Sequence, residues 1–509
     1  MTATASATTA PTKSSVQTPP SRLRRALGSR AALPVGLGVV GWLVAFTGSW
    51  IPSYWGDEAA SVMSAERSVP SLFRMLGNVD AVHGTYYLFL HYWIEVFGAS
   101  ELSTRFPSTV AAGFIVAGTF ILGQRLARRS VGITAALVCA LLPRVDYLGA
   151  ETRSYAFSTA IAVWLTIYLL ELVRRRSSAV LPWLGYAVAM AAGLYVFLYL
   201  GLLMLVHAGY LVTSRQFAPV RRRWLESAIV TVILSLPIIW FGYQERSQIA
   251  FLRERDYATV FNLLVMQWTG NVFLAIVVWA LVVLAVVSAI RAWRRWRERS
   301  ELIVLTLLWV ILPTTILLFM NIAVPTYNLR YVSFSAPALT LLAVAGAYRI
   351  RSRWLKVTAL GALVVFAIPT DIGQREPFAM DQGSDLAQTA ALIGAEAHPG
   401  DAVVFDRTSK PSQRLRLALH LYPTDFTGLK DVALKESYLD RAGLWDTTFP
   451  LDEVSERLNG VDTVWLLELT GSPDTVHRTD IHTLEDLGYT IQSKHTVNRA
   501  IVYKFSEGS

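Results

Sequence analysis

Charged residues are scarce in this chain of 509 residues. Asp, Glu, Lys and Arg make up 16% of the sequence, whereas 53% is hydrophobic, and the mean hydropathy is +0.41. A soluble protein carries charge on about a quarter of its residues. The composition therefore excludes an ordinary soluble protein and predicts a polytopic α-helical membrane protein.

Cysteine is nearly absent, and we do not expect the first residues to form a signal peptide. Cys139 is the only cysteine, so no disulfide can form within the chain and cysteine does not reveal the redox compartment. The first 20 residues are rich in Thr, Ser, Ala and Pro and have no apolar stretch like that of a cleaved signal peptide. We expect residues 1–30 to form a disordered cytoplasmic tail.

Long apolar runs dominate the sequence instead. A helical run of about 17 residues or more can cross a hydrocarbon core about 30 Å thick. We expect eleven such helices, which together form a transmembrane domain over residues 31–371. The segments are 33–51, 106–123, 131–148, 155–173, 179–195, 196–213, 227–242, 272–290, 302–322, 332–348 and 355–370.

Basic residues gather in alternate loops between these segments. Membrane proteins carry an excess of Lys and Arg in their cytoplasmic loops. The alternation predicts a multi-pass protein of the plasma membrane with a cytoplasmic amino terminus and an extracytoplasmic carboxyl terminus. It also accounts for the net charge of +9 and argues against nucleic-acid binding. The clusters are Arg22, Arg24, Arg25 and Arg30; Arg125, Arg128 and Arg129; Arg174, Arg175 and Arg176; Arg221, Arg222 and Arg223; RAWRRWRER at 291–299; and Arg349, Arg351 and Arg353.

This topology leaves two large extracytoplasmic regions. The first is the loop 52–105, which contains the aromatic stretch TYYLFLHYWIEVFG at 85–98. We expect this stretch to form a helix along the outer interface, where Tyr and Trp are favoured. A span there would place the later Arg clusters outside. The second region is the C-terminal part of the chain, residues 372–509.

Helix-like and strand-like stretches alternate in residues 372–509, which predicts a small α/β domain. SDLAQTAALIGAEA at 384–397 has the apolar spacing of an amphipathic helix, and DAVVFD at 401–406 has the pattern of a buried strand. Residues 461–469 and NRAIVYKF at 498–505 predict two further strands. The region has neither a GxGxxG motif nor a Gly-Lys-Ser run, so it lacks the usual nucleotide-binding loops.

In the predicted transmembrane domain, several charged residues outside the basic clusters lie at the outer ends of the spans. Asp57 and Glu58 follow the first span, and Arg105, Arg153 and Arg330 each precede a later one. A solvated acid pair, and arginines that anchor to lipid headgroups, are the alternative explanations. The outer leaflet should contain few arginines, yet three lie there. Because polar groups at membrane depth are costly, these three favour a functional site.

Sugar transfer from a polyprenyl phosphate is a chemistry that fits this combination of acids and arginines. A carboxylate can take the proton of the acceptor hydroxyl, and arginines can stabilise the departing phosphate. His83 can bind phosphate or relay a proton, or simply pack among the aromatic residues around it. No cofactor is needed. An Asp-Glu pair can ligate Mg²⁺ or Mn²⁺, but the arginines already supply positive charge, so we expect a metal-free site.

Five short motifs follow one another in the order known from one enzyme family. They are GDEAAS (56–61), VHGTYY (82–87), FGASELSTRFPS (97–108), ETRSY (151–155) and RYVSFSAPAL (330–339). Through them the chain resembles the dolichyl-phosphate-mannose protein mannosyltransferase-like family, glycosyltransferase family 39 of the GT-C superfamily. The resemblance covers residues 50–230 and, more weakly, 325–345. It implies a GT-C fold, an extracytoplasmic site and transfer with inversion from a polyprenyl-phosphate sugar.

The resemblance also implies roles for individual residues. Asp57 matches the family's catalytic acid, with Glu58 as its partner. We assign Arg105, Arg153, Arg330 and His83 to binding of the donor phosphate. His83 departs from the family pattern, because His-Gly-Thr replaces His-Pro-Pro and makes its loop less rigid.

The predicted function is transfer of mannose, or of another hexose or pentose, to an envelope lipid, glycan or protein. The C-terminal region is unlike the β-trefoil insertion of the eukaryotic protein mannosyltransferases, which weakens the case for a protein acceptor. A multi-span lipid or sugar transporter or flippase is the main alternative, but it should carry ionisable groups near the bilayer midplane or have corresponding helices interrupted in two repeated halves. A non-catalytic envelope scaffold is a third hypothesis, and it would not need Asp57.

Overall fold

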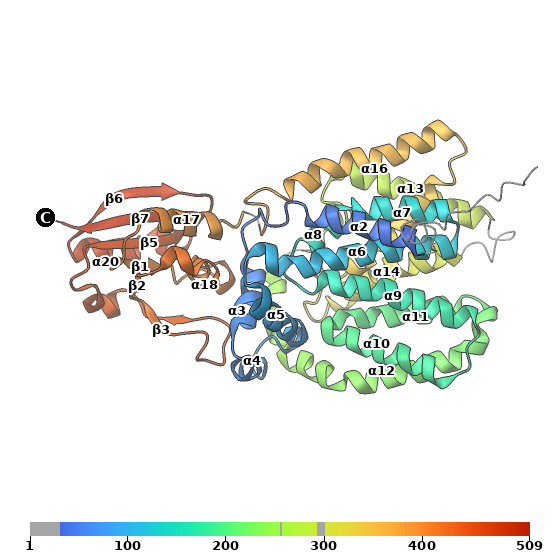
Figure 1. Ribbon diagram of the computed structural model, residues 1–509, viewed down its shortest axis with the longest axis horizontal. Helices are drawn as coiled ribbons and strands as arrows, with labels where there is room; N and C mark the ends of the chain where they lie inside the picture. The colour runs from blue at the N-terminus through green and yellow to red at the C-terminus, as the bar shows by residue number, and fades with distance from the viewer. Residues whose placement is uncertain (1–30, 255–256, 293–300, 382, 509) are drawn as a thin grey trace, which may run out of the picture.

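A bundle of helices and a smaller domain with a β-sheet at one end of the bundle make up the structure (Figure 1). This computed structural model describes residues 31–254, 257–292, 301–381 and 383–508. The predicted tail at 1–30 and most of the basic run at 291–299 lie outside the described residues.

Six described helices are long and apolar enough to cross a membrane, and a seventh span is present if one bent pair is counted as one. The pair is α7 (Arg129–Ala140) and α8 (Pro143–Gly149), which are bent by 60° relative to each other. Pro143 stands at this break, because its ring is tolerated in the first turn of a helix but not in a helix interior. The six helices are α6 (Glu101–Leu126), α9 (Tyr155–Arg174), α12 (Ala218–Gln244, extended by short turns at both ends), α13 (Val272–Ala292), α14 (Glu301–Met320) and α16 (Arg353–Gly373).

The prediction of a multi-span helical protein is confirmed, but the count of eleven spans is not. All eleven predicted segments coincide with helices, and four of these are shorter apolar helices of 10–17 residues. Composition cannot separate a membrane-spanning helix from a shorter buried one, because a helix buried among other helices is as apolar as one that faces lipid. Helix α15 shows this, since nearly all of its residues are buried. The four are α2 (Ala32–Phe46), α10 (Val180–Val196), α11 (Leu202–Val212) and α15 (Ala336–Ala347).

Glycines allow the helices of the bundle to approach one another closely. Helices α13 and α15 touch at Gly346, where a β-carbon would stand 1.9 Å from the carbonyl oxygen of Leu281. Helices α2 and α6 touch at Gly41, where a β-carbon would stand 2.5 Å from the side chain of Val116. Helix association in a membrane depends on such contacts, because lipid tails provide no hydrophobic driving force between helices.

Three shorter helices lie where the bundle meets the C-terminal domain (Figure 1). They are α3 (Gly56–Glu66), α4 (Val69–Leu76) and α5 (Gly84–Phe97). Helix α5 confirms the helix predicted at 85–98, while its position along the membrane interface stays a prediction. The α5 side chains of Phe89, Tyr92, Val96 and Phe97 are exposed, as an interfacial helix requires.

A five-stranded mixed sheet with the strand order β2-β1-β5-β7-β6 forms the centre of the C-terminal domain. Strand β1 is parallel to β2 and β5, whereas β7 is antiparallel to β5 and β6. A separate antiparallel pair, β3 and β4, lies outside this sheet. The strands are β1 (Ala402–Phe405), β2 (Lys430–Asp431), β3 (Leu434–Glu436), β4 (Thr447–Thr448), β5 (Thr463–Leu469), β6 (Tyr489–Thr496) and β7 (Ala500–Glu507).

The sequence predicts the buried elements of this domain and misses the exposed ones. The predicted helix at 384–397 is confirmed as α17 (Leu386–Glu396), and the three predicted strands are confirmed as β1, β5 and β7. Strand β6 escaped prediction because it is an edge strand whose residues, YTIQSKHT, are mostly exposed and polar. The remaining helices are short: α18 (Leu417–Leu421), α19 (Pro473–His477) and α20 (Thr479–Asp486).

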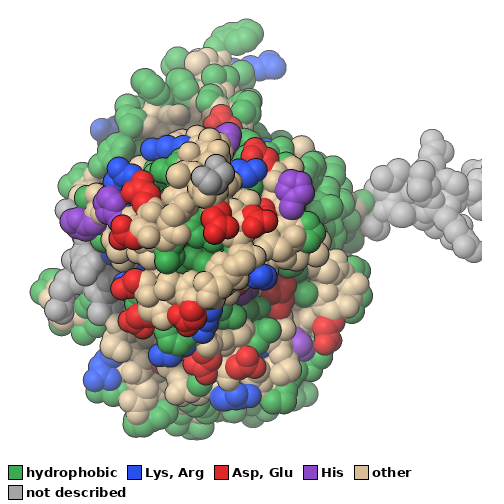
Figure 2. All heavy atoms as spheres, turned by 90° about the vertical axis from the view of Figure 1, so that its left-hand side faces the viewer, with side chains coloured by type: hydrophobic (Ala, Val, Ile, Leu, Met, Phe, Trp, Pro, Cys, Tyr) green, Lys and Arg blue, Asp and Glu red, His purple; other side chains and the backbone are tan. Residues whose placement is uncertain are grey.

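Helix α3 packs into the hydrophobic core of the C-terminal domain. Ala59, Val62 and Met63 are buried in one cluster with residues of α17, β1 and α18. A β-carbon on Gly56 would stand 2.0 Å from the carbonyl oxygen of Ser412, so the loop before α18 rests directly on the start of α3. Charged side chains of both signs are scattered over the face of the C-terminal domain that points away from the bundle (Figure 2). The C-terminal domain is therefore part of the support of α3.

We expect Gly346→Ala to lower the unfolding temperature of the protein in detergent, because the added methyl group forces α13 and α15 apart. Gly361→Ala is the matched control, since Gly361 also lies in a helix, α16, but has open space around the position of a β-carbon. At that position Ala should raise the free energy of unfolding by about 0.5 to 1 kcal/mol, the usual difference from Gly within a helix. Equal unfolding temperatures for the two variants would contradict the close packing at Gly346.

Candidate active site

Asp57 and Glu58 lie in the first turn of α3, which begins after the extended residue Trp55. Successive residues of a helix point roughly 100° apart, so the two carboxylates face different neighbours. The Glu58 side chain is 0% exposed and that of Asp57 is 32% exposed. The adjacent acids therefore belong to two different sets of contacts.

Glu58 forms a fully buried ion pair with Arg105 of α6. Nε and Nη2 of Arg105 donate to the two carboxylate oxygens of Glu58 at 2.8 and 2.7 Å. The other N–H groups of the guanidinium donate to the carbonyl oxygens of Ser49, Pro52 and Ser53. All five N–H donors of Arg105 thus have acceptors inside the protein.

The position of Arg105 differs from the one that its predicted role in phosphate binding requires. The residue has no exposed surface and no donor left for a ligand. It instead connects α6 to Glu58 and to the chain segment that leads into α3. The backbone N–H of Thr152 also donates to Oε1 of Glu58, at 2.8 Å. The ion pair therefore holds three separate segments of the chain together.

Arg330 joins Asp57 to a second carboxylate, that of Glu151. Nη2 of Arg330 lies 3.0 Å from Oδ2 of Asp57, and Nη1 lies 3.1 Å from Oε1 of Glu151. The guanidinium also lies over two aromatic rings, 4.6 Å from the centre of Trp55 and 5.7 Å from that of Tyr155. Contacts with rings orient a planar guanidinium. The guanidinium of Arg330 thus lies in a fixed orientation between the two carboxylates. The Arg330 side chain is 19% exposed.

Glu151 has a carboxylate oxygen that lacks a hydrogen-bond partner among the described residues. Its side chain is 1% exposed, and Oε2 is buried without a hydrogen-bond partner among the described residues. Burial raises the pKa of Glu151 to about 7 against the attraction of Arg330, and the negative charge of Glu58 adds to the rise. A carboxyl group with such a pKa exchanges its proton near neutral pH.

Arg153 and His83 lie beside the start of α3. Nη1 of Arg153 donates to the carbonyl oxygen of Asp57 at 3.2 Å, and Nη2 lies 3.2 Å from Nε2 of His83. A guanidinium can only donate, so Nε2 accepts and the ring of His83 is neutral, with its proton on Nδ1. Burial and the charge of Arg153 lower the pKa of His83 to about 4, which agrees with a neutral ring.

The Asp57 carboxylate stays ionised in this environment. Burial alone would raise the pKa of Asp57, but the charges of Arg330 and Arg153 outweigh burial and hold the pKa below its usual range. Two acids, Asp57 and Glu151, therefore face two guanidinium groups while His83 is neutral. Among these four charged groups the charges balance when Glu151 is ionised, and protonation of Glu151 adds one positive charge.

The structure brings Asp57, His83, Arg153 and Arg330 together, although they are far apart in the sequence. Sequence analysis did not assign Glu151 to the site. A signal was present, because Glu151 is a carboxylate at the end of an apolar segment, as Asp57 is. The aromatic partners Trp55 and Tyr155 were also missed, and no sequence pattern separates them from the many other aromatic residues of the chain.

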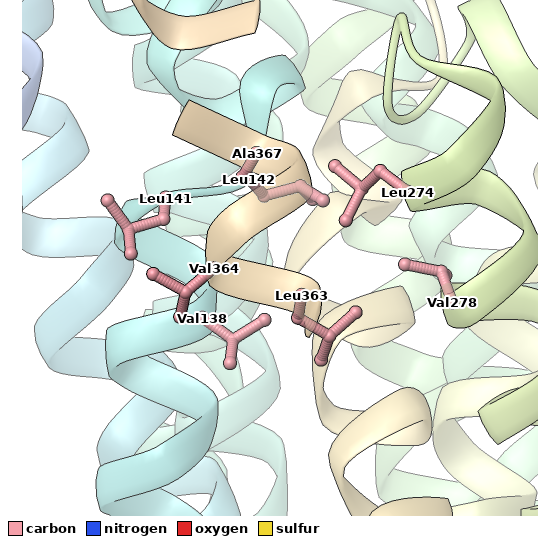
Figure 3. A pocket seen from close by; sticks show the side chains of 8 residues that line it. All are labelled: Val138, Leu141, Leu142, Leu274, Val278, Leu363, Val364 and Ala367. Atoms are coloured by element: carbon pink, nitrogen blue, oxygen red, sulfur yellow. The ribbon is translucent and has the colours of Figure 1, made fainter. Parts of the chain in front are cut away.

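Among the described residues, no three His, Cys, Asp or Glu side chains lie close enough together to hold a metal ion. An apolar pocket lies between α7, α13 and α16 (Figure 3). All of its lining side chains are hydrocarbon, so it suits an apolar group. They are Val138, Leu141, Leu142, Leu274, Val278, Leu363, Val364 and Ala367.

The fold resembles two solved structures of one protein, ArnT from Cupriavidus metallidurans. With ArnT bound to undecaprenyl phosphate, the TM-score is 0.58 at 13% sequence identity, over 94% of this chain and 98% of that one. With ArnT in the apo state, the TM-score is 0.52 at 13% identity, over 93% and 97% of the two chains. No family model and no curated protein sequence matches the chain. The chain is therefore a multi-span helical membrane protein with an ArnT-like fold, and its membership of glycosyltransferase family 39 is not confirmed.

Proposed function

We propose that this protein is a membrane glycosyltransferase that moves a sugar from a polyprenyl-phosphate donor to an acceptor hydroxyl. The observation that carries the proposal is the position of Arg330, which contacts Asp57 at 3.0 Å and Glu151 at 3.1 Å. A partly exposed arginine between two acids can bind a phosphate oxygen while one acid accepts a proton. The fold supports the donor class, because ArnT with a similar fold has been solved with bound undecaprenyl phosphate.

Asp57 is the proton acceptor in this proposal. In the free protein, Arg330 and Arg153 keep its pKa low and make it a weak base. A donor phosphate bound to Arg330 offsets that positive charge, so the pKa of Asp57 rises once the donor is in place. The acceptor oxygen then attacks the anomeric carbon, its proton passes to Asp57, and the bond from this carbon to the phosphate oxygen breaks with inversion. Arg330 stabilises the phosphate as it leaves.

The other predicted residues support this chemistry in different ways. Arg153 is a second donor-phosphate ligand, and His83 is a neutral hydrogen-bonding group beside it. Glu58 and Arg105 are positioning residues, because their buried pair holds the turn of α3 that carries Asp57. We propose no metal ion and no other cofactor.

The topology and the motifs suggest where the protein acts and on what. The alternation of basic loops favours a plasma-membrane protein with the site and the C-terminal domain on the extracytoplasmic face. The ordered motifs resemble those of glycosyltransferase family 39, which supports mannose or another hexose or pentose as the sugar. An envelope lipid, glycan or protein is the acceptor.

Asp57→Asn keeps the size of the side chain but removes the proton acceptor. We expect turnover to fall by about two to four orders of magnitude, the usual scale for a general base. The assay follows sugar transfer from a synthetic polyprenyl-phosphate sugar in envelope membranes, and Arg330→Gln should weaken donor binding in the same assay. Full activity of Asp57→Asn would overturn the assignment of the base. A wild-type protein that moves lipid across vesicles but never transfers sugar would instead be a flippase.

Glu58→Gln should destabilise the protein rather than only slow it. Removal of one partner from a buried ion pair leaves the other charge uncompensated and costs about 3 to 5 kcal/mol, so we expect a clearly lower unfolding temperature in detergent. Glu226→Gln is the control, because Glu226 also pairs with arginines, Arg222 and Arg223, but at the surface. An unchanged unfolding temperature for Glu58→Gln would show that the pair does not hold α3.

Donor affinity should fall as the pH rises through about 7. Below this value Glu151 is protonated and the cluster has an excess positive charge that attracts phosphate. Above it Glu151 is ionised and competes with the donor for Arg330. We therefore expect the KM for the donor to increase from about pH 6 to about pH 8, and Glu151→Gln to abolish this increase. The same pH dependence in Glu151→Gln and wild type would rule out Glu151 as its source.

A further inference from the structure

Four buried acids meet in the C-terminal domain, away from the candidate active site. Asp406 directly follows strand β1, and Glu468 lies near the end of strand β5. Asp474 lies in α19 and Asp480 in α20. None of the four residues is more than 4% exposed, and among the described residues none of them forms an ion pair. Acids are rarely buried without such a partner.

The sheet places Asp406 and Glu468 side by side. Strands β1 and β5 are parallel, and the backbone N–H of Asp406 donates to the carbonyl oxygen of Leu467 at 2.8 Å. Successive side chains of a strand point to opposite faces, so Glu468 shares the face of Leu466 and Asp406 that of Val404. Val404 and Leu466 are buried in one cluster with residues of α20 (Figure 1). Both carboxyl groups therefore lie on the face of the sheet that α20 covers.

Glu468 has no partner for either of its carboxylate oxygens. The residue is 0% exposed, and Oε1 and Oε2 both lack a hydrogen bond among the described residues. The hydroxyl of Thr475 in α19 faces Glu468, but it donates to the carbonyl oxygen of Leu469 at 2.9 Å. An ionised carboxylate would be buried here without compensation, which is far more costly than a neutral carboxylic acid.

The charges that act on Glu468 are mainly negative. Burial raises the pKa of Glu468 to about 7, and the charge of Asp480 adds to this rise, as do those of Asp406 and Asp474. Burial likewise raises the pKa of Asp480 to about 7, with Asp474 as the next cause. Arg407 supplies positive charge to the cluster, but its side chain is exposed, so water weakens its effect.

The neighbouring elements bring no further buried charge to this face. Strand β7 places Ile501 opposite Glu468 and Tyr503 further along the same face, whereas Lys504 lies over Trp465 on the other face. The other charged or titratable residues of α19 and α20, and Asp452 beside them, are exposed. Those of the two helices are His477, Arg478, His482, Glu485 and Asp486.

We infer that the four acids form a proton-dependent clasp, which holds α19 and α20 on the sheet while Glu468 is protonated and releases them when Glu468 is ionised. The O–H bond of the carboxyl group breaks on release, and its proton passes to water. Protonation rather than a metal ion neutralises the cluster, because among the described residues no three acids lie close enough together to hold one. The clasp makes the C-terminal domain sensitive to the pH of its surroundings, independently of sugar transfer.

Opening of α19 and α20 should become easier as the pH rises. An exposed Glu has a pKa of about 4.3, so Glu468 holds its proton more tightly in the closed domain than after opening. Below about pH 4.3 the closed form is fully stabilised. Between this value and about pH 7, opening releases a proton and its equilibrium constant rises about tenfold per pH unit. Above about pH 7 the effect levels off.

Hydrogen–deuterium exchange of the full-length protein in detergent tests the clasp. Protection of the amides of α19 and α20, corrected for the intrinsic effect of pH on exchange, is compared at about pH 5 and pH 7. We expect wild-type protection to fall by about tenfold or more over this range. Glu468→Gln is neutral at both pH values, so at about pH 7 these amides should be protected about tenfold better than in the wild type.

Glu485→Gln is the matched control. Glu485 also lies in α20, but it is exposed and pairs with Arg478 and His482 at the surface. We expect this variant to lose protection with rising pH as the wild type does. Glu151→Gln removes the carboxyl group of the candidate site whose pKa is also about 7, and it should leave the loss in α19 and α20 unchanged.

Three outcomes would overturn the clasp. Equal protection at the two pH values would show that no proton holds the helices. The same loss of protection in Glu468→Gln and wild type would show that the released proton comes from another group. Calcium chloride that restores protection of the wild type at about pH 7 would assign the cluster to a cation. Since the measurement uses no sugar donor, none of these outcomes changes the proposed function.

Discussion

The buried ion pair between Glu58 and Arg105 is the contact on which the geometry of the site depends. Two charges removed from water are costly unless every donor and acceptor is satisfied, and here the five N–H groups of Arg105 all have acceptors. The pair leaves the first turn of α3 little freedom to move relative to α6. Because Asp57 directly precedes Glu58 in that turn, the ion pair of Glu58 also fixes the position of the proposed base.

Helix α3 connects the two parts of the molecule as well as carrying the acid pair. Its Ala59, Val62 and Met63 are buried in the core of the C-terminal domain, while Glu58 is bound to the bundle. The C-terminal domain thus packs directly on the helix that carries the acid pair.

The local sequence was sufficient for many elements. The apolar runs marked the positions of all eleven predicted helical segments, and the patterns at 384–397, 401–406 and 461–469 marked α17, β1 and β5. The number of spans could not follow from composition, since helices such as α15 are apolar through burial in protein. Asp57, Arg153 and Arg330 could be proposed as one site because charges at span ends are costly. The family resemblance singled out Asp57 as the catalytic acid, but that Glu58 is buried against Arg105 while Asp57 faces Arg330 could not be predicted.

The sequence by itself determined that the chain crosses a membrane several times, ends in an α/β domain and keeps a few charges at the ends of its spans. These properties follow from composition and periodicity, which are local. Only the tertiary structure decided which charges face one another. It buried Arg105 against Glu58 and placed Arg330 between Asp57 and Glu151. Ion pairing depends on distances between residues that lie up to hundreds of positions apart, and these distances arise only when the helices pack.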